Sequence, residues 1–186
     1  MLGTAGAQAE TPPDMLVIAR EISSIADWDP AVSQILDVNE INNDIYDRLV
    51  GFDPRDPKDL TGALAESWQV SEDGTSITFK MRPGVTFHSG NPVTANDVVY
   101  SFRRLLLLDR EPSASMRAMG FTKENIDAGL SAPDEATFVL KPPLKLAPSF
   151  VLNLVSSSPF AIVDSVLVQE NEKNGDFGSA WLSNRS

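Results

Sequence analysis

The sequence predicts a mixed α+β (α/β) fold in which short hairpins alternate with amphipathic helices. Three observations carry that prediction. Residues 76–81 alternate apolar and polar side chains, as in a strand with one buried face. The pair Asp73-Gly74, which lies between two β-rich runs, is typical of a tight hairpin turn. Apolar residues recur at three- and four-residue steps between positions 30 and 48, which indicates a long helix.

The first predicted elements are a strand and that long helix. Residues 15–19 are an apolar run that follows two prolines, and they predict the first strand. Asp29 followed by Pro30 is typical of a helix N-terminus, so the helix is predicted over residues 30–48. Residues 53–59 contain three aspartates and two prolines. Because they lack the glycine and glutamate of an EF-hand, they predict a solvated connecting loop and not a calcium site.

A hairpin occupies the next stretch. The β-rich runs 67–71 and 76–81 flank the turn residues 72–75 and predict two antiparallel strands. An Arg-Pro-Gly sequence then ends the second strand, because proline lacks the N–H that the ladder needs. Residues 85–87 predict a third short strand.

A capped helix follows this hairpin. Thr94 precedes Asp97 by three residues, which is the capping-box spacing at the start of a helix. The apolar stripe of the helix is expected at Val98, Val99, Phe102 and Leu105. That stripe leaves Arg103 and Arg104 nearer solvent.

The last third of the chain predicts one more hairpin and two helices. The hairpin joins residues 126–131 to residues 136–140 through a Pro-Asp pair. The helices are predicted over residues 146–155 and 163–172.

Composition excludes several classes of function. With 15 basic and 26 acidic residues the net charge is −11, which argues against nucleic acid as a partner. No apolar run reaches the roughly 18 residues of a membrane span, so direct membrane insertion is not expected. The sequence has no cysteine, which excludes disulfides, thiolate metal sites, a cysteine nucleophile and a lipid-anchored cysteine within it.

Catalysis is not expected either. His88 is the only histidine, so a multi-histidine metal site cannot form, and neither a G-x-S-x-G motif nor a phosphate-binding loop is present. A pair of carboxylates stays possible among the acidic residues, but no motif singles one out. The sequence therefore predicts a protein that is not an enzyme and that uses no cofactor and no metal.

Four consecutive motifs carry a resemblance to a known family. They read LAESW at 64–68, SEDG at 71–74, TFKMRPGVTFHSG at 78–90 and PVTANDVVYS at 92–101. In this order and spacing they resemble the signature region of the family 5 extracellular solute-binding proteins, which are the dipeptide, oligopeptide and nickel receptors of ABC importers.

The resemblance implies an architecture. The chain would be the N-terminal part of a two-lobed periplasmic binding protein, an N-terminal fragment that lacks the second lobe. Residues 1–13 would be a residual signal sequence or flexible N-terminus, with a small-x-small pattern at residues 7–9. Residues 14–50 would begin lobe I, residues 51–162 would form a hairpin-rich subdomain, and residues 163–186 would return toward lobe I.

The resemblance also implies a function. The protein would capture a peptide or peptide-like solute without covalent chemistry and deliver it to an ABC permease in the inner membrane. It would be exported to the periplasm, not lipid-anchored, and a monomer when full length. An alternative stays open, in which the chain is a truncated, non-transporting module with a structural or interaction role and with apolar surface left exposed.

Ligand contacts are expected in the loop at residues 21–28, which faces the ligand in the family. There Ser23, Ser24 and Asp27 would form hydrogen bonds with the backbone or amine of a ligand, and Trp28 would pack against it. The other interpretation is that Asp27 and Asp29 only cap the following helix, with Trp28 in the core.

Overall fold

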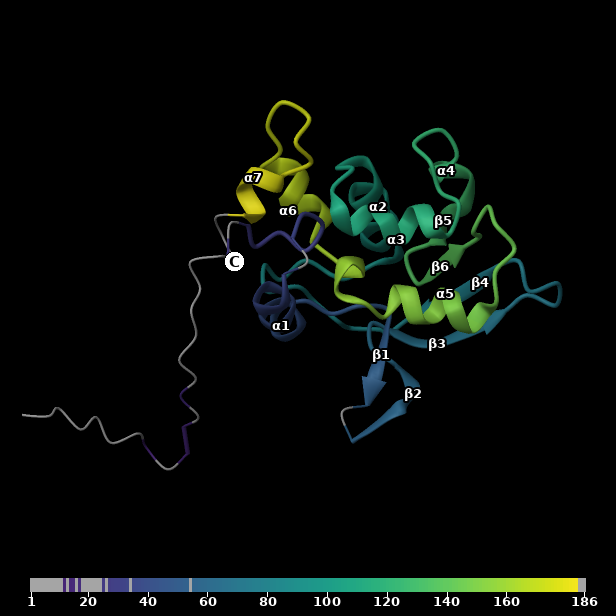
Figure 1. Ribbon diagram of the computed structural model, residues 1–186, viewed down its shortest axis with the longest axis horizontal. Helices are drawn as coiled ribbons and strands as arrows, with labels where there is room; N and C mark the ends of the chain where they lie inside the picture. Colours follow the sequence, from purple (N-terminus) through teal and green to yellow (C-terminus); the bar gives the residue numbers. More distant parts are fainter. Residues whose placement is uncertain are drawn as a thin grey trace, which may run out of the picture.

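The computed structural model describes residues 12, 14–15, 17, 25, 27–33, 35–53 and 55–183. Figure 1 shows α1, α6 and α7 toward one end of the molecule, the strands of the larger sheet toward the other, and α2 between them. In chain order the helices and strands are α1 (Leu36–Ile45), β1 (Val50–Asp53), β2 (Asp56–Gly62), β3 (Ala65–Val70), β4 (Ile77–Met81), α2 (Ala95–Leu107), η1 (Glu111–Ser113), α3 (Ala114–Ala118), α4 (Ile126–Gly129), β5 (Leu130–Asp134), β6 (Thr137–Leu140), α5 (Pro148–Val155), η2 (Ser158–Phe160), α6 (Ser165–Glu170) and α7 (Ser179–Leu182).

The larger sheet has four antiparallel strands in the order β3-β4-β6-β5. The predicted hairpin of β3 and β4 is confirmed, with Val70 opposite Ile77 next to the turn. Gly74 has the positive φ of 69° that this turn requires, and the Asp73 carboxylate accepts the N–H of Thr75 at 3.1 Å. Local turn chemistry therefore sets the register of this pair.

Residues 53–59 are not a solvated loop, and that prediction was wrong. Strands β1 and β2 form a second, two-stranded sheet in which Val50 lies opposite Gly62. In a two-stranded ribbon both strands are edges, so a proline costs the ladder little. The Asp53 carboxylate accepts the N–H of Arg55 at 2.8 Å and closes the turn between the strands.

The helix predicted over residues 30–48 is shorter, since α1 begins at Leu36 and ends at Ile45. The carbonyl of Asp29 accepts the N–H groups of Val32 and Ser33 in a separate turn, and Ile35 is extended with ψ 145°. The chain therefore turns once and straightens before α1 starts. Of the strand predicted at residues 15–19, Met15 and Val17 lie outside any strand, and residues 16, 18 and 19 lie outside the described part of the chain.

Two other strand predictions were wrong. Residues 85–87 form only an isolated bridge, between Thr86 and Pro92, because the chain reverses at once. Residues 126–129 form the short helix α4, which leads directly into β5. The β5–β6 hairpin itself is confirmed, and α5 and α6 lie within the two predicted helices at residues 146–155 and 163–172.

An aromatic cluster joins the larger sheet to α2. Phe79 of β4 stacks on Phe138 of β6 with ring centroids 5.9 Å apart. Phe102 of α2 meets Phe138 and Phe160 edge-on, with centroids at 5.3 Å and 4.9 Å. All four rings are buried, so this cluster is the centre of the main core.

The opposite side of α2 is polar and also buried. The predicted capping box is confirmed, since one oxygen of Asp97 accepts the backbone N–H of Thr94 at 2.8 Å. The other oxygen accepts the backbone N–H and the hydroxyl of Ser165, at 3.0 Å and 2.6 Å. One turn further along, the Ser101 hydroxyl accepts the N–H of Val163 at 3.0 Å. These bonds hold the start of α6 against α2.

Arg104 completes this polar face, and its predicted position near solvent was wrong. Its side chain is only 1% exposed and forms a two-pronged ion pair with the fully buried carboxylate of Asp29. Arg103 does lie nearer solvent, where it pairs with Asp127 at 2.9 Å. Since successive helical residues are about 100° apart, Arg104 shares the face of Asp97 and Ser101 while Arg103 points away from it.

We expect Phe138→Ala to lower the free energy of unfolding by about 3–5 kcal/mol, because it removes the ring that touches both Phe79 and Phe102. Urea denaturation measures the loss. Phe150→Ala is the matched control, since Phe150 is 45% exposed on α5, and it should change stability by no more than about 0.5 kcal/mol. Equal losses in the two variants would contradict this account of the core.

Candidate functional site

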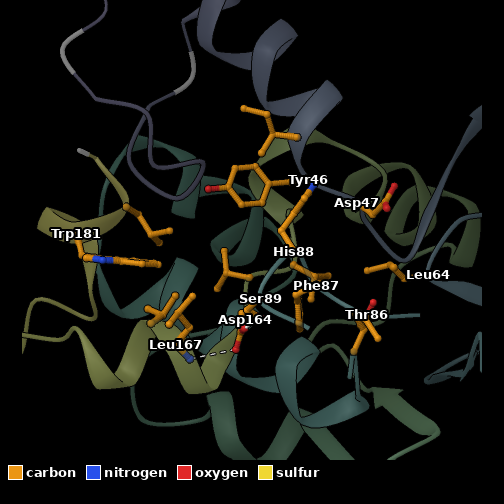
Figure 2. A pocket seen from close by; sticks show the side chains of 16 residues that line it. Tyr46, Asp47, Leu64, Thr86, Phe87, His88, Ser89, Asp164, Leu167 and Trp181 are labelled. Carbon is orange, nitrogen blue, oxygen red and sulfur yellow. Dashed lines mark hydrogen bonds between the residues drawn. The ribbon is translucent and has the colours of Figure 1, made fainter. Parts of the chain in front are cut away.

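An open pocket of about 390 Å³ lies between α1, the turn before α2, and α6 with α7. Figure 2 shows Tyr46 and Trp181 facing it, with Leu64 and Thr86 on the side away from Trp181. The lining is mostly apolar and comes from residues 45–47, 64, 86–89, 93, 162–164, 167–168 and 181–182. These ranges belong to five stretches of chain, 45–47, 64, 86–93, 162–168 and 181–182, which meet at one concave surface, the geometry that favours noncovalent binding.

Asp164 is the most highly connected polar group of the pocket. One oxygen caps α6 by accepting the N–H of Leu167 at 3.0 Å, the bond drawn in Figure 2. The other oxygen accepts the Ser89 hydroxyl at 2.6 Å and the Asn91 amide at 2.9 Å. Burial raises the pKa of Asp164, but these hydrogen bonds outweigh it, so the pKa lies below the ordinary 3.8. The carboxylate thus ties the turn before α2 to α6.

Tyr46 contributes a phenol that stays protonated. Burial and the nearby Asp29 carboxylate raise the pKa of Tyr46 to about 12, although Arg104 lowers it. A neutral hydroxyl can both donate and accept a hydrogen bond. Tyr46 therefore offers the pocket a neutral polar group beside an apolar ring.

His88 belongs to a turn between the bridge at Thr86 and the start of α2. Gly90, with φ 91°, donates its N–H to the carbonyl of Phe87 at 2.9 Å, which closes the reversal around His88. His88 lines the pocket, but the described residues hold no group of three histidines, aspartates or glutamates that could bind a metal ion. Nor is any helix in the described part of the chain long and apolar enough to cross a membrane.

Asp27, one of the predicted ligand contacts, binds a residue next to this pocket, and Trp28 follows it in the chain. Both are half-buried. The Asp27 carboxylate accepts the N–H of Asp29 at 2.9 Å and the hydroxyl of Ser183 at 2.6 Å. Ser183 directly follows the pocket residues Trp181 and Leu182, so the loop and the pocket meet at the end of α7. Ser23 and Ser24 lie outside the described residues.

Asp29 has a structural role. Its carboxylate accepts the N–H of Ala31 at 3.0 Å and binds Arg104, so it caps the turn that precedes α1. The interpretation that Asp29 caps the following helix was therefore wrong in its target, because Asp29 caps a single turn while α1 begins at Leu36 with Ile35 at its N-cap position. Trp68, on the β3–β4 hairpin, packs against the main core as a partly buried side chain.

Sequence reasoning missed the pocket itself. Tyr46 and Trp181 are isolated aromatic residues 135 positions apart in the sequence, and no motif connects them. No signal in the sequence links them, since they meet only in the fold, where both pack against Val163 and Val168 in a small second core at the end of the molecule that carries α6.

Known proteins are similar to this chain in sequence. The family model described as "Bacterial extracellular solute-binding proteins, family 5 Middle" matches residues 59–183. The "Probable D,D-dipeptide-binding periplasmic protein DdpA" of Escherichia coli K12 is 36% identical over 168 residues, which are 87% of this chain and 30% of that protein. "Heme-binding protein A" of Haemophilus influenzae is 45% identical over 74 residues, 37% of this chain and 13% of that protein.

Solved structures agree with the sequence comparison. The murein tripeptide binding protein MppA of Escherichia coli superposes with a TM-score of 0.66 at 28% identity, covering 81% of this chain and 31% of that one. The matched structures are two-lobed periplasmic binding proteins, and the relatives are binding proteins and not enzymes. This chain spans 30% of the length of the Escherichia coli DdpA relative and 31% of that of the MppA structure.

We expect the stability contributed by Asp164 to depend on pH. A carboxyl whose pKa is lowered by folding contributes stability that is fully present above its ordinary pKa of 3.8 and is lost as pH falls through the folded value. Asp164→Asn should therefore cost about 1 kcal/mol near pH 7, and the difference from wild type should shrink below about pH 4. Urea midpoints across that range measure it.

The control for this prediction is Asp127→Asn. Asp127 is exposed and pairs with Arg103, so its replacement should change stability by about 0.5 kcal/mol or less. A gap between wild type and Asp164→Asn that stayed constant from pH 7 to pH 3 would show that the carboxylate form is not what stabilises the fold.

Proposed function

This chain belongs to the family 5 bacterial extracellular solute-binding proteins, and from that premise we propose that it is part of the substrate-binding component of an ABC importer. The component captures a peptide or peptide-like solute in the periplasm and delivers it to an inner-membrane permease. The observation that carries the proposal is the family match over residues 59–183, which contains the β3–β4 hairpin, the turn and the capped start of α2.

A short peptide is the solute class that we favour. The D,D-dipeptide-binding relative aligns with 87% of the chain, whereas the heme-binding relative aligns with 37% of it. One structural neighbour, which covers 81% of the chain, is named for a murein tripeptide. Binding is noncovalent, because nothing beyond shape, hydrogen bonds and apolar contact is needed for capture and release.

The ligand-facing wall that we propose is the loop at residues 21–28. Support comes from Asp27, which binds Ser183 next to the pocket, and from Trp28, which is half-buried and is not among the residues of the main core. A ligand amine would pair with the Asp27 carboxylate, and a ligand side chain would pack on the Trp28 ring. Ser23 and Ser24 complete the proposed set as hydrogen-bonding groups.

Two distant segments belong to the same lobe in this proposal. Residues 27–31 and residues 163–183 both bind the buried polar face of α2, the first through Asp29 and the second through Val163 and Ser165. The Asp27 carboxylate also accepts the Ser183 hydroxyl, so the two segments contact each other directly. This contact supports a lobe I that begins at residues 14–50 and resumes at residues 163–186, with the hairpin-rich residues 51–162 between them in the chain.

Peptide binding by the protein isolated at its native length tests the proposal. Isothermal titration with D-Ala-D-Ala, L-Ala-L-Ala and tri-alanine should give saturable binding of at least one peptide, and free alanine serves as the negative control. At a peptide concentration of 100 times Kd, thermal unfolding should report about 2.7 kcal/mol of added stability. The intact mass in a periplasmic extract, detected with an antibody to this segment, establishes the native length.

The same titration tests the loop. Trp28→Ala should weaken peptide binding by about tenfold, which corresponds to about 1.4 kcal/mol, because it removes a ring that packs on the ligand. Trp68→Ala is the matched control, since Trp68 packs on the main core of the β3–β4 hairpin, and its variant should keep wild-type affinity while losing stability. Equal Kd values for wild type and Trp28→Ala would remove Trp28 from the site.

A second candidate function is an interaction module, and the exposed apolar side chains favour it. Leu36 is 80% exposed and Val166 53% exposed, and Ile45, at 39%, lines the pocket. An apolar surface of this kind binds another polypeptide or a second copy. The 186-residue chain should then associate with itself as its concentration rises.

Light scattering after size exclusion measures this association. Ile45→Glu, which places a charge on the pocket wall, should return the chain to a monomer. Phe150→Glu, on α5, should leave the association unchanged, since Phe150 is exposed but does not line the pocket. A wild-type chain that stays monomeric at every concentration contradicts this second function.

A further inference from the structure

The guanidinium of Arg104 contacts two distant segments at once. Its Nη1 donates to one Asp29 oxygen at 2.8 Å, and its Nη2 donates to the other. Its Nε donates to the carbonyl of Phe177 at 2.7 Å. Asp29 is 75 residues before Arg104 in the chain and Phe177 is 73 residues after it. One side chain on α2 therefore binds the N-terminal loop and the turn that leads to α7.

The hydrogen bonds continue from Asp29 into the proposed ligand wall. The N–H of Asp29 donates to the Asp27 carboxylate, and the Asp29 side chain in turn accepts the N–H of Ala31. The Asp29 carbonyl accepts from Val32 and Ser33. Three of the four bonded partners are the backbone N–H groups of residues 31–33, one bonded to the Asp29 carboxylate and two to its carbonyl, so the position of Asp29 sets the path of the loop.

A second set of bonds returns the network to α7. The Asp27 carboxylate accepts the Ser183 hydroxyl at 2.6 Å. Phe177 holds a left-handed backbone with φ 52°, which a residue with a bulky side chain rarely adopts, and in that conformation its carbonyl accepts from Arg104. The closed path runs from Arg104 through Asp29, Asp27 and Ser183 and back along the chain to Phe177. Within it, Arg104 is the only cation.

We propose that Arg104 is a positioning residue, which holds the loop of Asp27 and Trp28 in its binding conformation by clamping Asp29 without touching the ligand itself. The ligand role of that loop rests on the proposed function. The clamp itself rests on the bonds described above. Because the guanidinium is planar and presents its N–H groups as a fork, lysine can keep the charge at this position but not the three directed bonds.

Arg103 provides a matched control for replacing an arginine in α2. It is the adjacent residue of the same type on the same helix, but it is 44% exposed and pairs with the exposed Asp127. Arg103→Lys thus repeats the chemical change of Arg104→Lys at a site with no contact to the loop. Any difference between the two variants comes from the clamp and not from arginine replacement in α2.

The experiment combines amide hydrogen exchange with peptide titration on the native-length protein. In Arg104→Lys the amides of residues 29 and 31–33 should exchange at least tenfold faster, while the amides of β4 keep their protection. The Kd for the peptide identified above should rise by at least tenfold. Arg103→Lys should change neither value. Normal exchange in the loop of Arg104→Lys would overturn the clamp.

The two readouts separate the possible failures. Faster loop exchange with an unchanged Kd would overturn the positioning role and leave Arg104 as a structural residue. If wild type binds no peptide, the proposed function fails, and the exchange comparison still decides whether Arg104 fixes the loop. Should Arg104→Lys not fold, Asp29→Glu is the second variant, since it keeps the buried charge pair while moving the carboxylate by one methylene, and it should show the same faster exchange at residues 29 and 31–33.

Discussion

The buried ion pair between Arg104 and Asp29 is the interaction on which the arrangement of this protein depends. Removing two charges from water is costly, and in a folded protein the cost is offset only when the geometry is close to ideal. Loss of one partner typically costs about 3–5 kcal/mol, whereas an apolar replacement of both is often tolerated. The pair is therefore less a source of stability than a constraint on which segments meet, and it admits the loop of residues 27–33 at one place on α2.

Around that pair, α2 separates two kinds of packing. Phe102 faces the sheet and joins the aromatic cluster, while Asp97, Ser101 and Arg104 face the segments that carry the pocket and the loop. On the aromatic side, small shifts of α2 relative to the sheet cost little, because the hydrophobic effect does not depend on the direction of a contact. On the polar side, the same shifts would break hydrogen bonds, because each bond joins two defined groups. A helix of this kind can support a binding surface whose position must be reproducible.

The sequence was most informative where partners are local. The Asp73-Gly74 turn and the Thr94–Asp97 capping box each lie within a few residues, and both were predicted correctly. Arg104 was misplaced because its partner lies 75 residues away and because an identical arginine precedes it. Helical phase distinguishes the two, since Arg104 lies seven residues after Asp97 and shares its face. The pocket could not be predicted, because it forms only where five separate stretches of chain converge.

The spacing of the clamp also sets an order of assembly. During synthesis, Asp29 leaves the ribosome 75 residues ahead of Arg104, and Asp27 precedes its partner Ser183 by 156 residues. The β3–β4 hairpin and the capping box need only neighbours in the chain and form early, whereas contacts between distant residues form slowly. The N-terminal loop is thus made first and fixed last, after α2 and α7 exist to receive it. Before α2 is synthesised, Asp29 has no Arg104 to pair with, and its charge keeps the loop exposed to water. The loop becomes buried only after Arg104 is available to form the ion pair.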